Sequence, residues 1–339
     1  MAGDLKASIV IPTHNRHAVL LKVLACYAVQ SARPGSFEIV VVNDGGSDDT
    51  SSIFERLSRL ETGFLSRDRQ AAITEALSGR LCDVVTGRDA AYGGSPAVCY
   101  LKIVKSGRAA ARNAGIKVSK NDLIIFADDD IFVEPGFVQK HLAAHRPDDR
   151  LVVRGRVVRT ESLEDPFSAR WKLDDINTSF IATGNASVLK EHLVQAGCFD
   201  ERYTVYGWED FDLGIHLSEN GLKSIRRRIK GYHYDPKQEA LRPSELYGKE
   251  KERGLSAVYF YSCHPLPWVK RFTLVGNRSL RAFFSLLGRN NWFLKKDMIT
   301  RFKGILRLVV RYKGYFDGVV EAGRTEPAGD NGGAVENGG

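Results

Sequence analysis

Short apolar runs rich in β-branched residues alternate with stretches of helical periodicity along most of the chain. The runs predict buried strands at residues 8–12, 37–42 and 122–126, and further strands are predicted at residues 98–104, 151–159 and 223–234. Apolar positions three and four apart predict helices at residues 16–30, 48–60, 71–77, 106–118, 134–145, 190–196 and 210–220, the fourth with Ser106 as its candidate N-cap. This alternation predicts an α/β fold, in which helices flank a mostly parallel sheet.

The character of the chain changes at about residue 241. Residues 268–315 have helical propensity and carry twelve Lys and Arg residues against one acid, Asp297. Residues 323–339 are rich in glycine and nearly free of large apolar side chains, which predicts a disordered tail. We therefore expect an α/β domain over residues 1–240, a basic helical extension over residues 241–322 and a tail over residues 323–339.

Composition narrows the class of protein. Of 339 residues, 43% are hydrophobic and 27% charged, as in ordinary globular proteins, and the net charge of +8 suits an anionic partner. Five widely spaced cysteines without a CxxC pair argue against a disulfide framework or a zinc site. The sequence shows no signal peptide and no run of about 18 apolar residues. We expect a cytoplasmic protein, with at most peripheral contact with the inner face of a membrane.

Three adjacent carboxylates, Asp128, Asp129 and Asp130, follow the predicted strand at residues 122–126. They repel one another, and a divalent cation such as Mg²⁺ or Mn²⁺ would relieve that repulsion, because hard oxygen ligands suit both ions. Polar residues also follow the first two predicted strands, and the carboxyl ends of parallel strands share one edge of a sheet. The alternative is a solvated acidic turn.

Two further groups of polar residues have the right chemistry for a site at this edge. Arg108 and Arg112 lie four apart on one predicted helix and would bind a diphosphate through paired N–H groups, unless they only form a solvated helix face. The acids of the segment 206–210, YGWED, would supply a general base or cap the following helix. His233 ends a strand and would complete a metal site or serve a structural role.

Six segments together resemble family 2 glycosyltransferases, which have the GT-A fold. In chain order they are SIVIPTHNR (8–16), EIVVVNDGGSDDT (38–50), GRAAARNAGI (107–116), DLIIFADDD (122–130), TGNAS (183–187) and YGWEDFDLG (206–214). The second segment departs from the usual DDGS, so only its Asp44 corresponds to a functional position of the family. Residues 61–106 are longer than the family pattern, and we assign them no contacts.

The resemblance implies a role for each matching residue. The expected nucleotide-sugar ligands are Thr13, Asn15, Arg16, Asp44, Arg108, Arg112, Asn113, Asp128 and Asp129. Asp130 and His233 are expected to hold Mn²⁺ or Mg²⁺. Asp210 is expected to act as the catalytic base with Glu209 beside it, and Gly184, Asn185 and Trp208 to lie on the acceptor side.

The implied activity is inverting, metal-dependent transfer of a hexose from a nucleotide-sugar donor to a hydroxyl of a glycan or lipid-linked acceptor, in polysaccharide or glycoconjugate biosynthesis. UDP is the expected nucleotide, with GDP and dTDP left open. A nucleotidyltransferase would also place aspartates on an α/β sheet, but no Gly-rich loop follows the first strand. No zinc-finger or RNP-like motif supports nucleic-acid binding, and intact Asp128, Asp130 and Asp210 argue against an inactive glycan-binding protein. The basic helices would either contact an anionic membrane or pack on the α/β domain.

Overall fold

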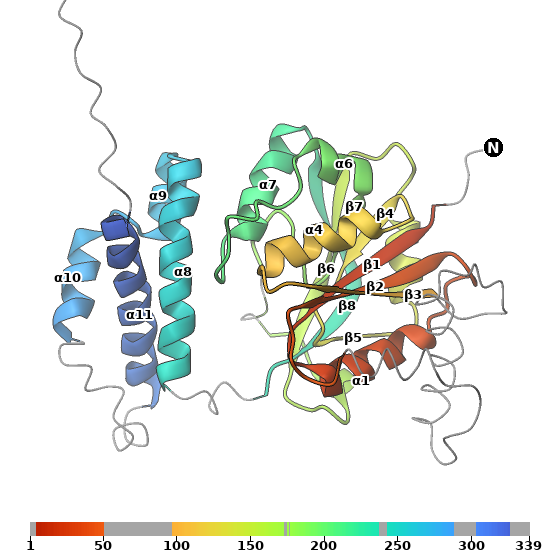
Figure 1. Cartoon of the computed structure of the whole chain (residues 1–339), viewed down its shortest axis with the longest axis horizontal. Helices are drawn as coiled ribbons and strands as arrows, with labels where there is room; N and C mark the ends of the chain where they lie inside the picture. The colour runs from red at the N-terminus through yellow and green to blue at the C-terminus, as the bar shows by residue number, and fades with distance from the viewer. Residues whose placement is uncertain are drawn as a thin grey trace, which may run out of the picture. The chain divides into compact units, whose positions relative to one another are not determined.

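The computed structural model describes residues 5–50, 97–172, 175, 177–236, 243–287 and 303–325. Contacts divide the chain into two compact units (Figure 1). The first comprises Met1–Thr204 and Glu209–Gln238, and the second comprises Val205–Trp208 and Glu239–Gly339. The predicted helix at residues 71–77, nearly all of the one at 48–60 and the tail beyond residue 325 lie outside the described residues.

The first unit is built on a mixed sheet. Its described strands form one eight-stranded sheet in the order β3-β2-β1-β4-β7-β6-β8-β5. In that order they are Ala97–Ile103, Phe37–Asp44, Ala7–Thr13, Leu123–Phe126, Ala186–Leu189, Leu151–Thr160, Lys223–Tyr234 and Ile131–Val133. Strands β3, β2, β1 and β4 run parallel, as do β6 and β8, whereas β7 is antiparallel to both of its neighbours and β5 to β8. The predicted α/β fold with a mostly parallel sheet is confirmed.

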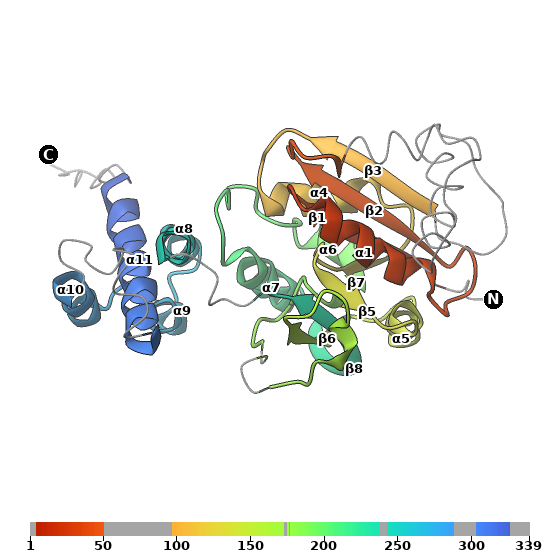
Figure 2. The ribbon, with the colours of Figure 1, turned by 90° about the horizontal axis from the view of Figure 1, so that it is seen from below.

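Helices cover both faces of this sheet (Figures 1 and 2). Strands β1, β2 and β4 are buried on both sides, because their continuous apolar runs supply side chains to two cores. One core packs against α1 (His17–Ala28) and α5 (Phe137–Ala143). The other packs against α4 (Arg108–Val118), α6 (Lys190–Gln195) and α7 (Glu209–Glu219).

One local prediction is wrong, and two short strands were not predicted. Ser106 does not cap α4: its hydroxyl donates to the Val104 carbonyl, and Gly107 occupies the N-cap position with a φ of 95°. A side chain at Gly107 would be strained there, so glycine fits the position. The strands β5 and β7 were not predicted, because runs of three and four residues are too short for a periodic signal.

The second unit is helical, as predicted. It comprises α8 (Pro243–Cys263), α9 (Pro267–Thr273), α10 (Arg278–Leu287) and α11 (Lys303–Thr325). Helix α11 ends three residues beyond the predicted boundary at residue 322. Helices α8 and α11 approach closely at glycines: a Cβ on Gly254 would lie 1.9 Å from the Tyr315 carbonyl oxygen, and one on Gly318 would lie 2.0 Å from that of Lys251. None of the helices in the described part of the chain is long and apolar enough to cross a membrane.

Candidate active site

Polar side chains gather where three neighbouring parallel strands end. Strands β2, β1 and β4 lie side by side in the sheet, so their carboxyl ends share one edge. That edge carries Asp44, Thr13 and the three aspartates at residues 128–130. Strand β8 adds His233, which pairs in register with Ile131, directly after the aspartates. An open α/β sheet binds its ligands at such an edge.

Asp129 is held inside the first unit. Its carboxylate accepts hydrogen bonds from the Thr13 hydroxyl (2.7 Å) and from Arg16 Nη1 (3.3 Å). Burial raises the pKa of Asp129 to about 6, with Arg16 acting against the rise and Asp130 adding to it. With one oxygen bonded to the end of β1 and the other to Arg16 in the loop after it, Asp129 fixes the position of that loop.

Asp130 offers the better site for a cation. Its carboxylate pairs with Arg16, and Oδ2 lies 3.3 Å from His233 Nε2. Burial acts to raise the pKa of Asp130, but His233 and Arg16 outweigh it and hold the pKa below its ordinary value. The other oxygen, Oδ1, is buried and has no hydrogen-bond partner among the described residues. A carboxylate with one unsatisfied oxygen beside an imidazole fits Mn²⁺ or Mg²⁺.

Arg112 joins the aspartate cluster to the acids of α7. This buried guanidinium places Nη2 3.1 Å from Asp128 Oδ1, while Nη1 lies 3.3 Å from Glu209 Oε1 and 3.8 Å from Asp210 Oδ1. Burial acts to lower the pKa of Arg112, but the carboxylates of Asp210, Asp128 and Glu209 keep it above the ordinary value. Arg112 was predicted on a diphosphate. The structure places it between carboxylates, in contact with residues that follow it by 16 and 97 positions.

Asp210 has the surroundings expected of a base. Its oxygens accept hydrogen bonds from the Thr183 hydroxyl at 3.0 and 3.1 Å and from the Thr183 amide at 3.3 Å. The side chain is 24% exposed, so a substrate hydroxyl has access to it. Loss of hydration raises the pKa of Asp210 to about 7. Arg112 opposes that rise, and the Glu209 and Asp128 carboxylates add to it. A carboxylate with such a pKa can accept a proton near neutral pH.

Asp44 and Asn15 hold the loops around this edge of the sheet. Asp44 accepts hydrogen bonds from the amides of Ser106 (2.6 Å) and Gly107 (3.1 Å), and Lys105 Nζ lies 2.9 Å from its carboxylate. Burial acts to raise the pKa of Asp44, but these donors lower it overall. Asn15 Oδ1 accepts hydrogen bonds from the amides of residues 47 and 48 at 2.8 and 3.2 Å. A nucleoside bound at this edge would contact loops that the protein has already fixed.

The remaining predicted residues have different surroundings. Arg108 is exposed at the first position of α4, and the Asn113 side chain bonds both the amide and the carbonyl of Phe199. A Cβ on Gly184 would lie 3.3 Å from Asp128 Oδ2. Asn185 is fully buried and donates to the carbonyls of residues 156 and 229, so we assign its side chain a structural role. Trp208 packs within the second unit, stacked on Phe260 with ring centroids 5.5 Å apart.

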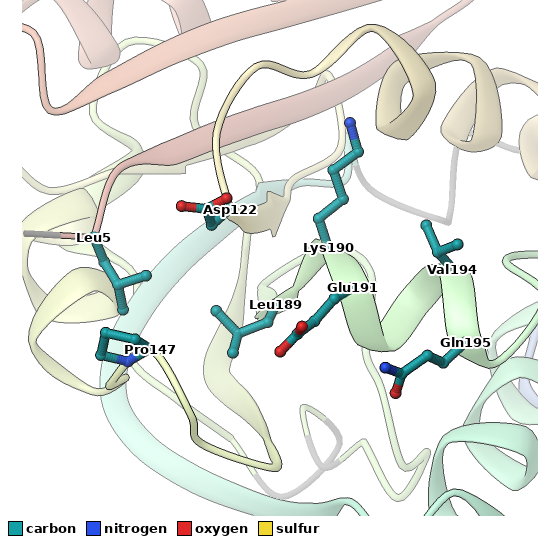
Figure 3. Close-up of a pocket in the computed structure, with 8 residues that line it drawn as sticks. All are labelled: Leu5, Asp122, Pro147, Leu189, Lys190, Glu191, Val194 and Gln195. Carbon is teal, nitrogen blue, oxygen red and sulfur yellow. The ribbon is translucent and has the colours of Figure 1, made fainter. Parts of the chain in front are cut away.

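Thr183 is a site residue that the sequence did not single out. It lies in the TGNAS segment, yet no periodicity or spacing connects it with an acid 27 positions later. A pocket elsewhere in the first unit carries no comparable chemistry (Figure 3). It lies at the opposite edge of the sheet, where β1 and β4 begin, and its lining residues are Leu5, Asp122, Pro147, Leu189, Lys190, Glu191, Val194 and Gln195.

The sequence matches a family model described as "Glycosyl transferase family 2". The match covers residues 8–78 and 85–199, which is more than half of the chain. It includes the segment that contains Arg112 and the segment that ends at the three aspartates, and it stops before Glu209 and Asp210. The sheet edge that carries Asp44, Thr13 and the three aspartates therefore lies inside the matched region.

Individual relatives are distant. The uncharacterized glycosyltransferase YfnE of Bacillus subtilis (strain 168) is 25% identical over 68% of this chain and 65% of its own length. A validoxylamine A glucosyltransferase of Streptomyces hygroscopicus subsp. limoneus is 27% identical over 63% of this chain and 48% of its own length. The amylovoran biosynthesis glycosyltransferase AmsB of Erwinia amylovora is 22% identical over 90% of this chain and 97% of its own length. The chain thus spans less than two thirds of YfnE and about half of the glucosyltransferase.

A solved structure shares the fold. The mannosyltransferase PcManGT of Pyrobaculum calidifontis, solved with GDP-Man and Mn²⁺, superposes with a TM-score of 0.52 at 14% identity, covering 96% of this chain and 89% of the other. At that identity the likeness supports the fold alone.

Proposed function

The chain belongs to glycosyl transferase family 2, and from this premise we propose that it transfers a hexose from a nucleotide sugar to an acceptor hydroxyl, with inversion at the sugar carbon. Arg112 carries the proposal, because this one buried cation contacts both Asp128 and the acids of α7. A donor group at Asp128 and a base at Asp210 would then lie on two sides of the same reacting centre. UDP is the proposed nucleotide.

The donor side would use the edge formed by β2, β1 and β4. Asp44, Asn15 and Thr13 would hold the nucleoside, with Arg16 and Arg108 near the phosphates. Asp130 and His233 would hold the divalent cation, which would supply positive charge to the departing diphosphate. PcManGT, of the same fold, was solved with both a nucleotide sugar and Mn²⁺. The unsatisfied Asp130 Oδ1 supports the same use of this edge.

The acceptor side would use Asp210 as a general base. As the acceptor oxygen forms its bond to the sugar carbon, the bond from that carbon to the diphosphate oxygen breaks, and Asp210 takes the hydroxyl proton. Thr183 holds the carboxylate by two of its groups, so the base is oriented before the acceptor arrives. Attack opposite the leaving group inverts the sugar carbon without a covalent intermediate.

The acceptor would be a hydroxyl of a glycan or a lipid-linked saccharide. AmsB, which aligns with nearly the whole of this chain, is named for the synthesis of a polysaccharide, amylovoran. Gly184 and Trp208 are the proposed acceptor-side residues. Gly184 leaves room beside Asp128, where a side chain would be in tight contact.

The test is thermal unfolding of the chain against a panel of nucleotide sugars, with and without Mn²⁺, followed by product detection with the best donor. A ligand that binds only the folded state at 100 times its dissociation constant adds about 2.7 kcal/mol of stability. We expect one nucleotide sugar to raise the midpoint only with Mn²⁺, and Asp130→Ala to lose that effect. The control Asp148→Ala, at an exposed acid of another loop, should respond like the wild type. No shift with any donor under either condition would overturn the proposal.

A further inference from the structure

Helix α10 of the second unit has an apolar face wider than its packing requires. Leu280, Phe283, Phe284 and Leu287 follow the spacing i, i+3, i+4, i+7, so they form one stripe along the helix. Arg278, Arg281 and Ser285 repeat at a similar spacing on the opposite side. The helix is therefore amphipathic along its whole length.

Only one edge of this stripe packs inside the protein. Phe284 is buried and stacks on Tyr312 of α11, with ring centroids 4.7 Å apart. Phe283 and Leu287 of the stripe remain 56% and 38% exposed, and Leu286, which borders the stripe, is 70% exposed. These three large apolar side chains are neighbours on one short helix, where exposed apolar groups are unfavourable in water and indicate an interaction surface.

Cations are also present on α10, opposite the stripe, and on α9. In the part of the chain that the structure describes, Arg278 and Arg281 of α10 and Lys270 and Arg271 of α9 make no ion pair. Further along, α11 differs, because its Arg311 pairs with Glu250 at 2.9 Å and its Lys313 with Asp317. Helix α9 also exposes large aromatic side chains, Trp268 at 49% and Phe272 at 47%. The positive charge of these two helices is therefore available to an anionic partner.

We propose that α10, assisted by α9, docks the second unit onto an anionic lipid bilayer. In this arrangement Phe283, Leu286 and Leu287 enter the boundary between headgroups and acyl chains, and the four cations contact lipid phosphates. A second copy of the chain fits poorly, because two such surfaces would bring like charges together. Nucleic acid would use the cations but leave Leu286 without a partner. The docking involves no step of sugar transfer.

The test is flotation of the full chain with vesicles of phosphatidylcholine alone or with phosphatidylglycerol added. We expect binding only to the anionic vesicles, weakening as salt rises. Phe283→Ser with Leu286→Ser should reduce the vesicle affinity at least about tenfold, because the anchoring side chains are lost. Arg278→Gln with Arg281→Gln should reduce it about 30-fold, since each cation near such a surface contributes about a factor of five.

Matched control variants make the same kinds of substitution away from α10, so they show whether a loss of vesicle binding depends on where the residues lie. Val194→Ser changes an exposed apolar residue of α6, and Arg227→Gln with Arg228→Gln removes the same charge from an exposed stretch of β8. Both should bind vesicles like the wild type. Equal loss in the controls, or no binding to anionic vesicles, would overturn the proposal. So would binding to an RNA oligonucleotide that competes with vesicles and survives the Phe283 and Leu286 changes. Thermal unfolding of each variant shows whether it is folded, since every substituted position is accessible to solvent.

Discussion

At the scale of single residues, we expect the stability of the site to depend on Arg112. Its guanidinium is 3% exposed and lies within 4 Å of the carboxylates of Asp128, Glu209 and Asp210. Without it these acids would repel one another with no cation between them. We expect Arg112→Ala to lower the free energy of unfolding by about 3–5 kcal/mol in urea titrations.

Arg112→Lys should fall between the wild type and Arg112→Ala, because an ammonium group keeps the charge but lacks the planar fork that reaches several carboxylates. Arg108→Ala, an exposed change on the same helix, should alter the free energy of unfolding by less than about 0.5 kcal/mol. If Arg112→Ala cost no more than Arg108→Ala, the guanidinium would not be balancing the cluster.

Substitutions at Asp210 and Thr183 would test whether Asp210 is the catalytic base. Asp210→Asn keeps the shape of the side chain but cannot accept the proton, so kcat should fall by about 10² to 10⁴ while donor binding persists. Thr183→Val should keep most of the activity at high pH. It removes a hydrogen bond to the charged form of Asp210, so the pKa of Asp210 should rise above about 7.

The sign of the pH effect follows from the active form, which is the deprotonated carboxylate. Activity should rise with pH through the pKa of Asp210, and in Thr183→Val that rise should occur at higher pH. Rates measured from pH 5 to 9 with saturating donor would show the displacement. A profile identical to the wild type would mean that Thr183 does not act on the base.

At the scale of elements, the packing of α8 on α11 depends on glycine at particular positions. A Cβ on Gly254 would meet the Tyr315 carbonyl oxygen, so Gly254→Ala must push the helices apart and should destabilise the second unit by about 1–3 kcal/mol. Gly248 lies on the same helix with nothing within 4 Å of its Cβ position. Gly248→Ala should therefore stabilise the unit by up to about 1 kcal/mol, because alanine favours helix. Chemical denaturation of both variants would check the opposite signs.

The contact of α5 and the residues after it with β7 is polar and sensitive to acid. His141 Nδ1 and His145 Nε2 lie 2.8 and 2.9 Å from the Ser187 hydroxyl, and His141 Nε2 lies 3.0 Å from Asn185 Oδ1. Neutral tautomers satisfy all three contacts. Burial lowers the pKa of His141 to about 3 and that of His145 to about 4.

Because the unfolded chain takes up these protons at about pH 6.5, the neutral histidines favour the folded state fully above that pH. Their contribution is lost as the pH falls toward the folded-state pKa of about 4 for His145 and about 3 for His141. Each should cost about 2 kcal/mol of folding free energy at pH 5. Urea unfolding of wild type and His145→Gln at pH 7 and 5 would isolate one of them. An equal pH dependence in both proteins would contradict this account.

Elements with a clear period were predictable, and contacts between distant residues were not. Strand β8 has its predicted bounds, and Gly221 and Asp235 lie beyond its two ends. The gathering of Asp44, Thr13 and the three aspartates at one edge of the sheet also followed from sequence, since neighbouring parallel strands end together. Arg112 was predicted to bind a phosphate. A helical pattern shows which face of the helix Arg112 lies on, but not which distant residues contact that face. Asn185 is buried because its side chain bonds to β6 and β8. The sequence around Asn185 does not indicate these contacts with distant strands.

At the scale of the whole molecule, the boundary between the units falls next to the proposed base. Residues 205–208 group with the helical unit, where the Trp208 indole donates to the Arg253 carbonyl at 2.9 Å. Residue 209 begins α7 of the first unit. A cut at residue 240 would remove Phe260 and Arg253, so it would leave Trp208 without its packing partners. Sugar transfer should therefore be tested with the full chain rather than with the first 240 residues alone.

Since each unit has its own core, calorimetry of the full chain should show two unfolding transitions. A nucleotide sugar with Mn²⁺ should raise only the transition of the first unit, by about 2.7 kcal/mol at 100 times the dissociation constant, because the proposed donor residues lie there. Gly254→Ala should lower only the other transition. A single transition that moves with both the ligand and the substitution would instead mean that the two units unfold as one, and the free energies above would then describe the whole chain.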